Sequence, residues 1–284
     1  MRQAADSASF RSMIRSSLLI LLTALSAIGE AQGRRVLLDE AHHNVHTLLG
    51  TYKPFADLLR GEGYRLAANK RVLDAGALAD CDVLVISNPR GAPETAPLER
   101  RAEPAFTDAE ADAVAAWVKQ GGSLLLIADH WPIGPATQGL ASRFGVRMSG
   151  GWTEDAAHTT TRPGHLLFSR EQGLIGDHAI TRGRNGKERV HRVMSFLGQS
   201  LEGPSTSVAL LRLSPTAVDR LPPDRRTVTA AGRSQGLTFE FGKGRVVVLG
   251  EAAMLTVQPG MEMDVPGNDN RQLGLNIMGW LSRR

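Results

Sequence analysis

The sequence contains a single cysteine, Cys81, among 284 residues. An internal disulfide bond is therefore excluded, because such a bond needs two cysteines. Cys81 directly precedes residues 82–86, Asp-Val-Leu-Val-Ile, which places it at the start of an expected strand. Catalytic groups of α/β proteins gather at the opposite, carboxyl ends of the strands. We therefore expect Cys81 to be a small buried residue and not a nucleophile.

Aromatic residues make up only 5% of the chain, and the formal net charge is a mild +4. The densest basic run lies between Arg182 and Arg192 and contains no aromatic side chain. A nucleic-acid surface usually combines clustered basic residues with stacking side chains, so this run indicates a solvated loop and no nucleic-acid partner. The remaining composition, with 42% hydrophobic residues, is that of an ordinary globular protein.

A long hydrophobic run is also missing. The apolar stretch at residues 18–25 is shorter than the ~20 residues that a membrane-spanning helix needs. Arg11 and Arg15 precede it and small residues follow as far as Gly33, which is the pattern of a secretory signal peptide. We predict a signal over residues 1–33, possible initiation at Met13, and an exported protein, periplasmic or secreted, without a membrane span after cleavage. An uncleaved N-terminal membrane anchor is the alternative.

Residues 34–284 alternate strand and helix patterns and predict a single α/β domain. Apolar runs at 36–38, 64–67, 82–87 and 123–128 indicate strands, and Thr107 with Glu110 forms a capping box that starts a helix. A glycine turn at 242–244 joins two further strands into a hairpin, and a helix over 272–281 follows. We expect a flavodoxin-like, mostly parallel sheet with helices on both faces, and an embellished C-terminal half that ends in this hairpin and helix. Residues 150–235 predict a loop-rich insertion or small lobe, with one strand at 207–211.

Polar side chains stand where four of these strands end. Because ligands of open α/β sheets bind outside the carboxyl ends of the strands, we expect these side chains to share one crevice. The candidate catalytic residues are Glu40, His42, Asp129, His130 and Glu251. The candidate ligand-binding residues are His43, His46, Ser87 and Asn88.

Two kinds of chemistry fit this crevice. His42 and His46 are spaced i, i+4, which on a helical turn would present two imidazoles to one divalent metal. His42 or His130 paired with Glu40 or Asp129 would suit acid–base catalysis near neutral pH. Alternatively, some of these histidines cap the following helix or hold loops. The pattern assigns no metal ligand set, and the cofactor is unknown.

Several stretches together resemble a known family. They are DEAHHN at 39–44, ADHWP at 128–132, DHAITRGR at 177–184, GKGRV at 242–246 and GEAAM at 250–254. They resemble a bacterial domain of unknown function in the class I glutamine-amidotransferase-like superfamily, near its gliding-motility and intraflagellar-transport relatives. The resemblance spans most of residues 35–283 and implies a flavodoxin-like sheet, but no assigned reaction. True amidotransferases carry a nucleophilic cysteine at a strand-to-helix elbow, which Cys81 does not match.

Two functions remain open on the sequence. The first is a non-catalytic domain that holds a small ligand or a protein partner in the crevice. The second is a hydrolase that uses His and carboxylate acid–base chemistry or a divalent metal. We favour binding, because the sequence supplies no complete catalytic constellation.

Overall fold

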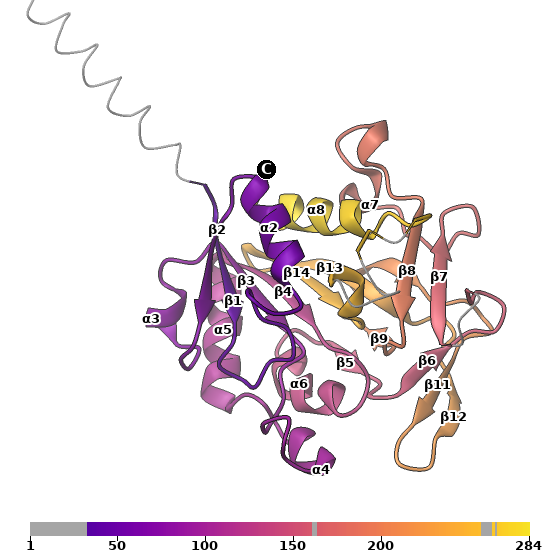
Figure 1. The fold of residues 1–284 in the computed structure, drawn as a ribbon, viewed down its shortest axis with the longest axis horizontal. Helices are drawn as coiled ribbons and strands as arrows, with labels where there is room; N and C mark the ends of the chain where they lie inside the picture. Colours follow the sequence, from indigo (N-terminus) through magenta and orange to yellow (C-terminus); the bar gives the residue numbers. More distant parts are fainter. Residues whose placement is uncertain (1–32, 161–163, 257–262, 265) are drawn as a thin grey trace, which may run out of the picture. The chain divides into compact units, whose positions relative to one another are not determined.

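The strands predicted from the apolar runs lie side by side in one sheet (Figure 1). The computed structural model describes residues 33–160, 164–256, 263–264 and 266–284, and Arg34–Arg284 form one compact unit. The elements, in chain order, are β1 (Arg35–Asp39), α2 (Lys53–Gly61), β2 (Arg65–Asn69), α3 (Ala75–Leu78), β3 (Val83–Ser87), α4 (Leu98–Arg101), α5 (Asp108–Gln120), β4 (Ser123–Ile127), α6 (Ile133–Ser142), β5 (Arg147–Met148), β6 (Trp152–Glu154), β7 (His165–Ser169), α7 (Ala179–Arg182), η2 (Gly186–Glu188), β8 (Arg192–Phe196), β9 (Leu201–Glu202), β10 (Val208–Arg212), β11 (Val218–Leu221), β12 (Arg226–Thr229), β13 (Ser234–Phe241), β14 (Gly244–Leu249), η3 (Ala253–Leu255) and α8 (Asn270–Leu281).

The largest sheet has the strand order β2-β1-β3-β4-β14-β13-β9-β5, with β10 also paired to β13. Strands β2, β1, β3, β4 and β14 run parallel to one another, and β13 runs antiparallel to β14 as the expected hairpin. This is the order of a flavodoxin-like sheet, whose strand order reverses between β1 and β3. The predicted fold class, including the terminal hairpin and helix, is confirmed.

Apolar side chains pack on both faces of this sheet. Along β4, Leu124 and Leu126 belong to one buried cluster and Leu125 and Ile127 to the other, because successive strand residues point to opposite faces. The first cluster includes side chains of α5 and α6, and the second includes side chains of α2 and α8. Each fully buried leucine contributes about 1.5–3 kcal/mol. A strand covered on both faces therefore reads as a continuous apolar run.

The prediction that residues 150–235 hold only one strand is wrong. Besides β9 and β10, which join the large sheet, this region contains the strands of a small sheet of order β12-β11-β6 and the strand pair β7-β8. Buried Asp219 fixes part of it by accepting hydrogen bonds from Thr153 Oγ1 at 2.7 Å and Ser200 Oγ at 2.6 Å. The strands of the small sheet are short, so their stability depends on such long-range partners, whereas β7 and β8 bury Leu166, Phe168, Val193 and Phe196 in the core.

None of the helices among the described residues is long and apolar enough to cross a membrane. The predicted signal peptide over residues 1–33 lies, apart from Gly33, outside the described residues.

Candidate functional site

The loops that follow β1, β3, β4 and β14 are joined by hydrogen bonds at the carboxyl edge of the sheet. Val45 N donates to Asn88 O at 3.0 Å, and Asp129 N donates to Asn88 Oδ1 at 3.0 Å. Ala252 N in turn donates to Asp129 Oδ1 at 2.7 Å. The strand order thus places the four predicted stretches next to one another, although their side chains divide into two clusters.

The first cluster holds His42 between two carboxylates. His42 Nδ1 lies 2.8 Å from Asp39 Oδ2, and His42 Nε2 lies 3.0 Å from Glu110 Oε1. Asp39 is completely buried, His42 is 7% exposed, and Asn69 Nδ2 donates to Asp39 Oδ1 at 3.1 Å. Because both ring nitrogens have carboxylate partners, His42 is arranged as an ionic bridge between the β1 loop and α5.

Burial by itself lowers the pKa of His42, but the hydrogen bonds and negative charges of Asp39 and Glu110 outweigh that effect and raise it above 6.5. The pKa of Glu110 is lowered: burial opposes the ionised form, while the hydrogen bonds from Thr107, His42 and Leu73 favour it and prevail. Both shifts favour an ion pair, with a charged imidazolium facing a charged carboxylate.

Glu110 is the main residue of this cluster that sequence reasoning missed. The predicted capping box is present, because Glu110 N donates to Thr107 Oγ1 at 3.3 Å and Thr107 N donates to Glu110 Oε2 at 3.0 Å. That motif accounts for Oε2 alone. Oε1 faces His42 and also accepts a hydrogen bond from Leu73 N at 3.1 Å. The burial of Glu110 in the first turn of its helix would have indicated a further partner, but this burial can be seen only in the folded structure.

The second cluster is centred on Asn88. Asn88 Nδ2 donates to Asp129 Oδ2 at 2.6 Å and lies 3.3 Å from His46 Nε2. Its φ of 47° is in the left-handed region, which asparagine tolerates better than most residues. Ser87 precedes it, fully buried, and its Oγ has no partner in hydrogen-bond geometry among the described residues. Asn88 thus links the loops after β1 and β4.

His46 is a neutral member of this second cluster. Its ring stacks on Tyr52 with the centroids 4.6 Å apart, and its Nδ1 lies 2.6 Å from Thr51 Oγ1. Burial, and then the positive charge of Arg90, lowers the pKa of His46 to about 4. His46 therefore acts as a hydrogen-bonding ring without charge at neutral pH.

Asp129, which is partly buried, and Glu251, which is completely inaccessible, are two carboxylates of the same cluster. The oxygens of Glu251 accept hydrogen bonds from Ala253 N at 2.6 Å and Met254 N at 3.0 Å. Burial, and then the charge of Asp129, raises the pKa of Glu251 well above 4.5, and burial likewise raises the pKa of Asp129. The pair binds a proton more readily than exposed carboxylates do.

Glu40 and His43 lie apart from both clusters. Glu40 Oε1 accepts a hydrogen bond from Leu48 N at 2.8 Å, so this carboxylate holds the loop after β1. His43 is exposed, and its carbonyl oxygen accepts a hydrogen bond from Arg90 Nε at 2.8 Å. His42 and His46 do not lie on a helical turn, which the metal interpretation of their spacing would need: the first helix after β1 begins at Lys53, and the two imidazoles face different partners.

His130 stands at the rim of the site and is only partly buried. Its Nδ1 lies 2.7 Å from Trp131 O, and its ring packs 5.0 Å from the Trp152 ring, centroid to centroid. Because a carbonyl oxygen only accepts, this contact assigns the proton of the neutral ring to Nδ1. Nε2 then carries the lone pair.

Cys81 lies just before β3, away from the carboxyl edge, as expected. Burial raises the pKa of its thiol to about 12, so the thiol stays protonated at neutral pH. Within the described residues, no group of three or more His, Cys, Asp or Glu side chains is arranged to hold a metal ion.

No protein-family profile matches this sequence, and no curated protein matches it. Among solved structures, the mmIFT52 N-terminal domain aligns with a TM-score of 0.66 and 16% identity, over 87% of this chain and 97% of that one. A ThuA-like protein from Bacteroides uniformis aligns with a TM-score of 0.47 and 14% identity, over 88% of this chain and 91% of that one. A ThuA-like protein from Parabacteroides merdae aligns with a TM-score of 0.42 and 11% identity, over 88% of this chain and 90% of that one. At 16% identity, the first likeness shows a shared fold and carries no activity with it.

Proposed function

We propose that this chain is an exported domain with a glutamine-amidotransferase-like fold that binds a partner at the carboxyl edge of its sheet, without cysteine-based amidotransferase activity. Of the two classes of partner, a small molecule or a protein, the exposed side chains at this edge favour a protein. The observation that carries the proposal is a contrast: the inward-facing ionisable side chains of this edge are engaged with the chain itself, whereas its loops present large apolar side chains to solvent.

The inward-facing groups support a structural role. Asp129 Oδ1 accepts from Ala252 N at 2.7 Å, and both oxygens of Glu251 accept backbone amides. His42 has a carboxylate on each ring nitrogen, at 2.8 and 3.0 Å. A general base needs a lone pair that can reach the substrate proton, and these groups are buried and already paired. They stabilise the loops on which the rim stands.

The rim supplies apolar area. Val45 is 38% and Leu49 is 82% exposed on the loop after β1, Val72 is 60% exposed after β2, and Leu98 is 41% exposed at the start of α4, after β3. A contiguous patch of large exposed apolar side chains is typical of protein–protein contact sites. Since these loops leave neighbouring strands of the sheet, they favour a single docking surface.

A hydrolase is the second candidate, and His130 is the observation in its favour. The contact between Nδ1 and Trp131 O leaves the Nε2 lone pair as the basic atom of a partly exposed ring. His130 also follows Asp129 directly at the end of β4. One imidazole without a partner nucleophile or oxyanion donors makes an incomplete catalytic set, so binding remains the better-supported function.

Activity assays test this proposal. The chain should release no ammonia from glutamine above the buffer rate, and should turn over no ester, amide or glycoside of a broad panel. The matched variants are Cys81→Ala and His130→Ala. Turnover that Cys81→Ala abolishes would contradict the absence of cysteine chemistry. Turnover that His130→Ala abolishes would establish the hydrolase instead.

A further inference from the structure

A cavity lies at the other end of the sheet, away from the carboxyl edge. Its volume is about 370 Å³, within the range of small-molecule pockets. It opens over the first residues of β1 and β2, which run parallel with Arg35 opposite Arg65 and Leu37 opposite Ala67. Residues opposite each other in a parallel pair point to the same face, so two arginines and two apolar side chains line this cavity together.

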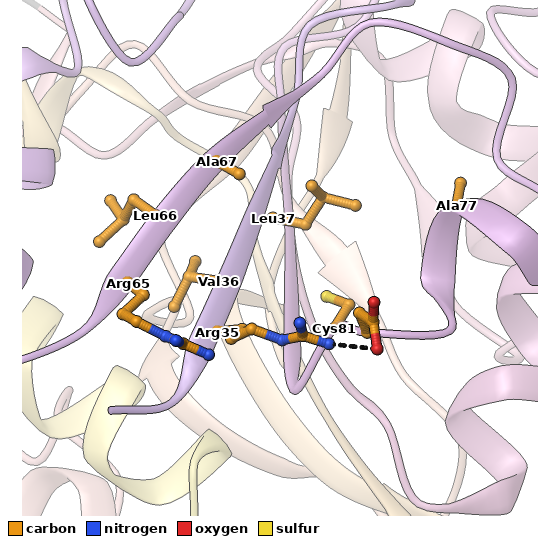
Figure 2. A pocket seen from close by; sticks show the side chains of 9 residues that line it. Arg35, Val36, Leu37, Arg65, Leu66, Ala67, Ala77 and Cys81 are labelled. Atoms are coloured by element: carbon orange, nitrogen blue, oxygen red, sulfur yellow. Dashed lines mark ion pairs between the residues drawn. The ribbon is translucent and has the colours of Figure 1, made fainter. Parts of the chain in front are cut away.

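The cavity exists because this face of the sheet edge is thinly covered. On the opposite face, Val36 and Leu38 are only 3% exposed beneath α2. On the cavity face, Arg65 and Ala67 are exposed and Leu37 is half-buried, because the element facing them is α3, a helix of four residues. Figure 2 shows Ala77 of α3 across the cavity from Leu37 of β1. The cavity therefore has an apolar floor and one apolar wall.

The side chains that line the cavity carry two positive charges and one negative charge. Arg35 Nη2 forms an ion pair with Asp80 Oδ1 at 2.6 Å, the contact drawn as a dashed line in Figure 2. The side chain of Arg65 has no acidic partner among the described residues, although it lies opposite another arginine. Like charges directly across a strand pair repel each other, so an added anion would relieve this repulsion.

Cys81 completes the lining without opposing an anion. Its thiol borders the cavity, and because burial raises its pKa to about 12 it carries no negative charge at neutral pH. Asp80 is the one carboxylate of the lining, and Arg35 neutralises it. The guanidinium of Arg65 is thus the group of the cavity that lacks a counter-ion.

We propose that this cavity binds a small organic carboxylate with an apolar body. The carboxylate pairs with the Arg65 guanidinium, whose planar fork suits two parallel hydrogen bonds. The apolar part lies on Leu37 and Ala67 and against Ala77. This site is separate from the partner-binding edge, because it lies at the amino ends of β1 and β2, and it does not depend on the function proposed above.

The test is a titration of the ¹⁵N-labelled full chain with 4-phenylbutyrate and, separately, with its neutral analogue 4-phenylbutyramide. We expect amide shifts at Arg35–Leu37, Arg65–Ala67 and Cys81 with the acid, and weaker binding of the amide by about tenfold. Arg65→Gln should weaken binding of the acid by about tenfold or more, as loss of a charge-assisted pair does. Arg226→Gln, which removes the same charge from an exposed arginine of β12, should leave binding unchanged.

Three results would overturn the proposal. One is the absence of shifts at these residues up to the solubility of the acid. Another is equal binding of acid and amide, or equal binding to the wild type and Arg65→Gln, since charge would then play no part. The third is a dimer in sedimentation experiments that Arg65→Gln dissociates, because this would assign the cavity to a second copy of the chain.

Discussion

Glu110 Oε1 and His42 Nε2 lie 3.0 Å apart, although 68 positions of the chain separate the two residues. This contact joins the first turn of α5 to the loop after β1, and Asp39 holds the other side of the ring. A single imidazole thereby fixes two elements that leave the same edge of the sheet. The stability of that edge therefore depends on whether His42 is protonated.

Glu110→Gln tests this bridge without removing the helix cap, because glutamine can also complete a capping box. The pKa of His42 should fall, since one of the two charges that raise it is lost. The free energy of unfolding at pH 6 should fall by about 1–3 kcal/mol, the range for hydrogen bonds to charged groups. NMR titration of His42 and urea unfolding measure these quantities.

The control for this experiment is Glu99→Gln, which removes a carboxylate from the first turn of α4 at an exposed position. It should alter neither the pKa of His42 nor the stability by more than about 0.5 kcal/mol. An unchanged pKa of His42 in Glu110→Gln would show that the contact has no electrostatic effect.

His46 should make the protein sensitive to acid. Its pKa is about 4 in the folded state against 6.5 as the ordinary value. A lowered histidine pKa stabilises the fold above pH 6.5, and this stabilisation is lost as the pH falls towards 4, by about 3 kcal/mol in total. His46→Gln should remove this part of the pH dependence in urea unfolding. The exposed His191→Gln should retain it, and an equal slope in both variants would refute the assignment.

The carboxylate pair Asp129 and Glu251 should make the stability depend on pH in the opposite direction. The pKa of Glu251 is raised, so its stabilisation is present below pH 4.5 and is lost as the pH rises through the folded-state value. Asp129→Asn should cost about 1–3 kcal/mol at pH 4.5, because an amide nitrogen would face a donor, Asn88 Nδ2 or Ala252 N. The difference in unfolding free energy between Asp129→Asn and the wild type should become smaller as the pH rises. In the variant, Glu251 has lost the neighbouring charge that opposes its ionisation, so raising the pH destabilises the variant less than the wild type.

Urea unfolding between pH 4.5 and 8 measures the unfolding free energies of the variant and the wild type. Asp224→Asn changes an exposed aspartate in the same way, and its unfolding free energy should depend on pH as that of the wild type does. A deficit of Asp129→Asn that stays constant, or grows with pH, would contradict the coupling of the two carboxylates.

Cys81 should react slowly. With a thiol pKa of about 12, the reactive thiolate is a very small fraction at pH 8. In urea the pKa returns to its ordinary value, and the thiolate fraction rises about 1000-fold. Because a more basic thiolate is also more nucleophilic, which offsets part of this difference, alkylation by iodoacetamide should be about 100-fold slower in the folded protein than in urea. Mass spectrometry of timed samples measures both rates, and comparable rates would show an accessible, activated thiol.

The parallel half of the fold was predictable because its strands are continuous apolar runs. β3 and β4 are buried on both faces, so every residue from Val83 to Ile86 and from Leu124 to Ile127 is apolar. The region of β6 to β12 was not predictable in this way. β9 has two residues and β6 has three, and their partners lie far away in the sequence. A periodic pattern cannot develop over so few residues.

The proximity of the strand-end residues was predictable, whereas their individual hydrogen-bond partners were not. Strand ends indicated Asn88, Asp129 and Glu251, because ligand sites of α/β sheets lie there. The i, i+4 spacing of His42 and His46 was misleading, since the residues between β1 and Lys53 form a loop without a helix. Glu110 was hidden by its own capping motif, which explains one of its oxygens and says nothing about the other.

The central claim is that the carboxyl-edge loops bind a protein partner. Leu49 is 82% exposed on this edge, whereas Lys243 is exposed in the turn between β13 and β14, at the opposite edge of the sheet. The direct measurement is photo-crosslinking in the producing cells, with p-benzoylphenylalanine introduced in place of Leu49 or of Lys243. We predict one discrete crosslinked product from position 49, lost when Val72→Ser and Leu98→Ser are added, and none from position 243. No product from position 49, or equal products from both positions, would contradict the account.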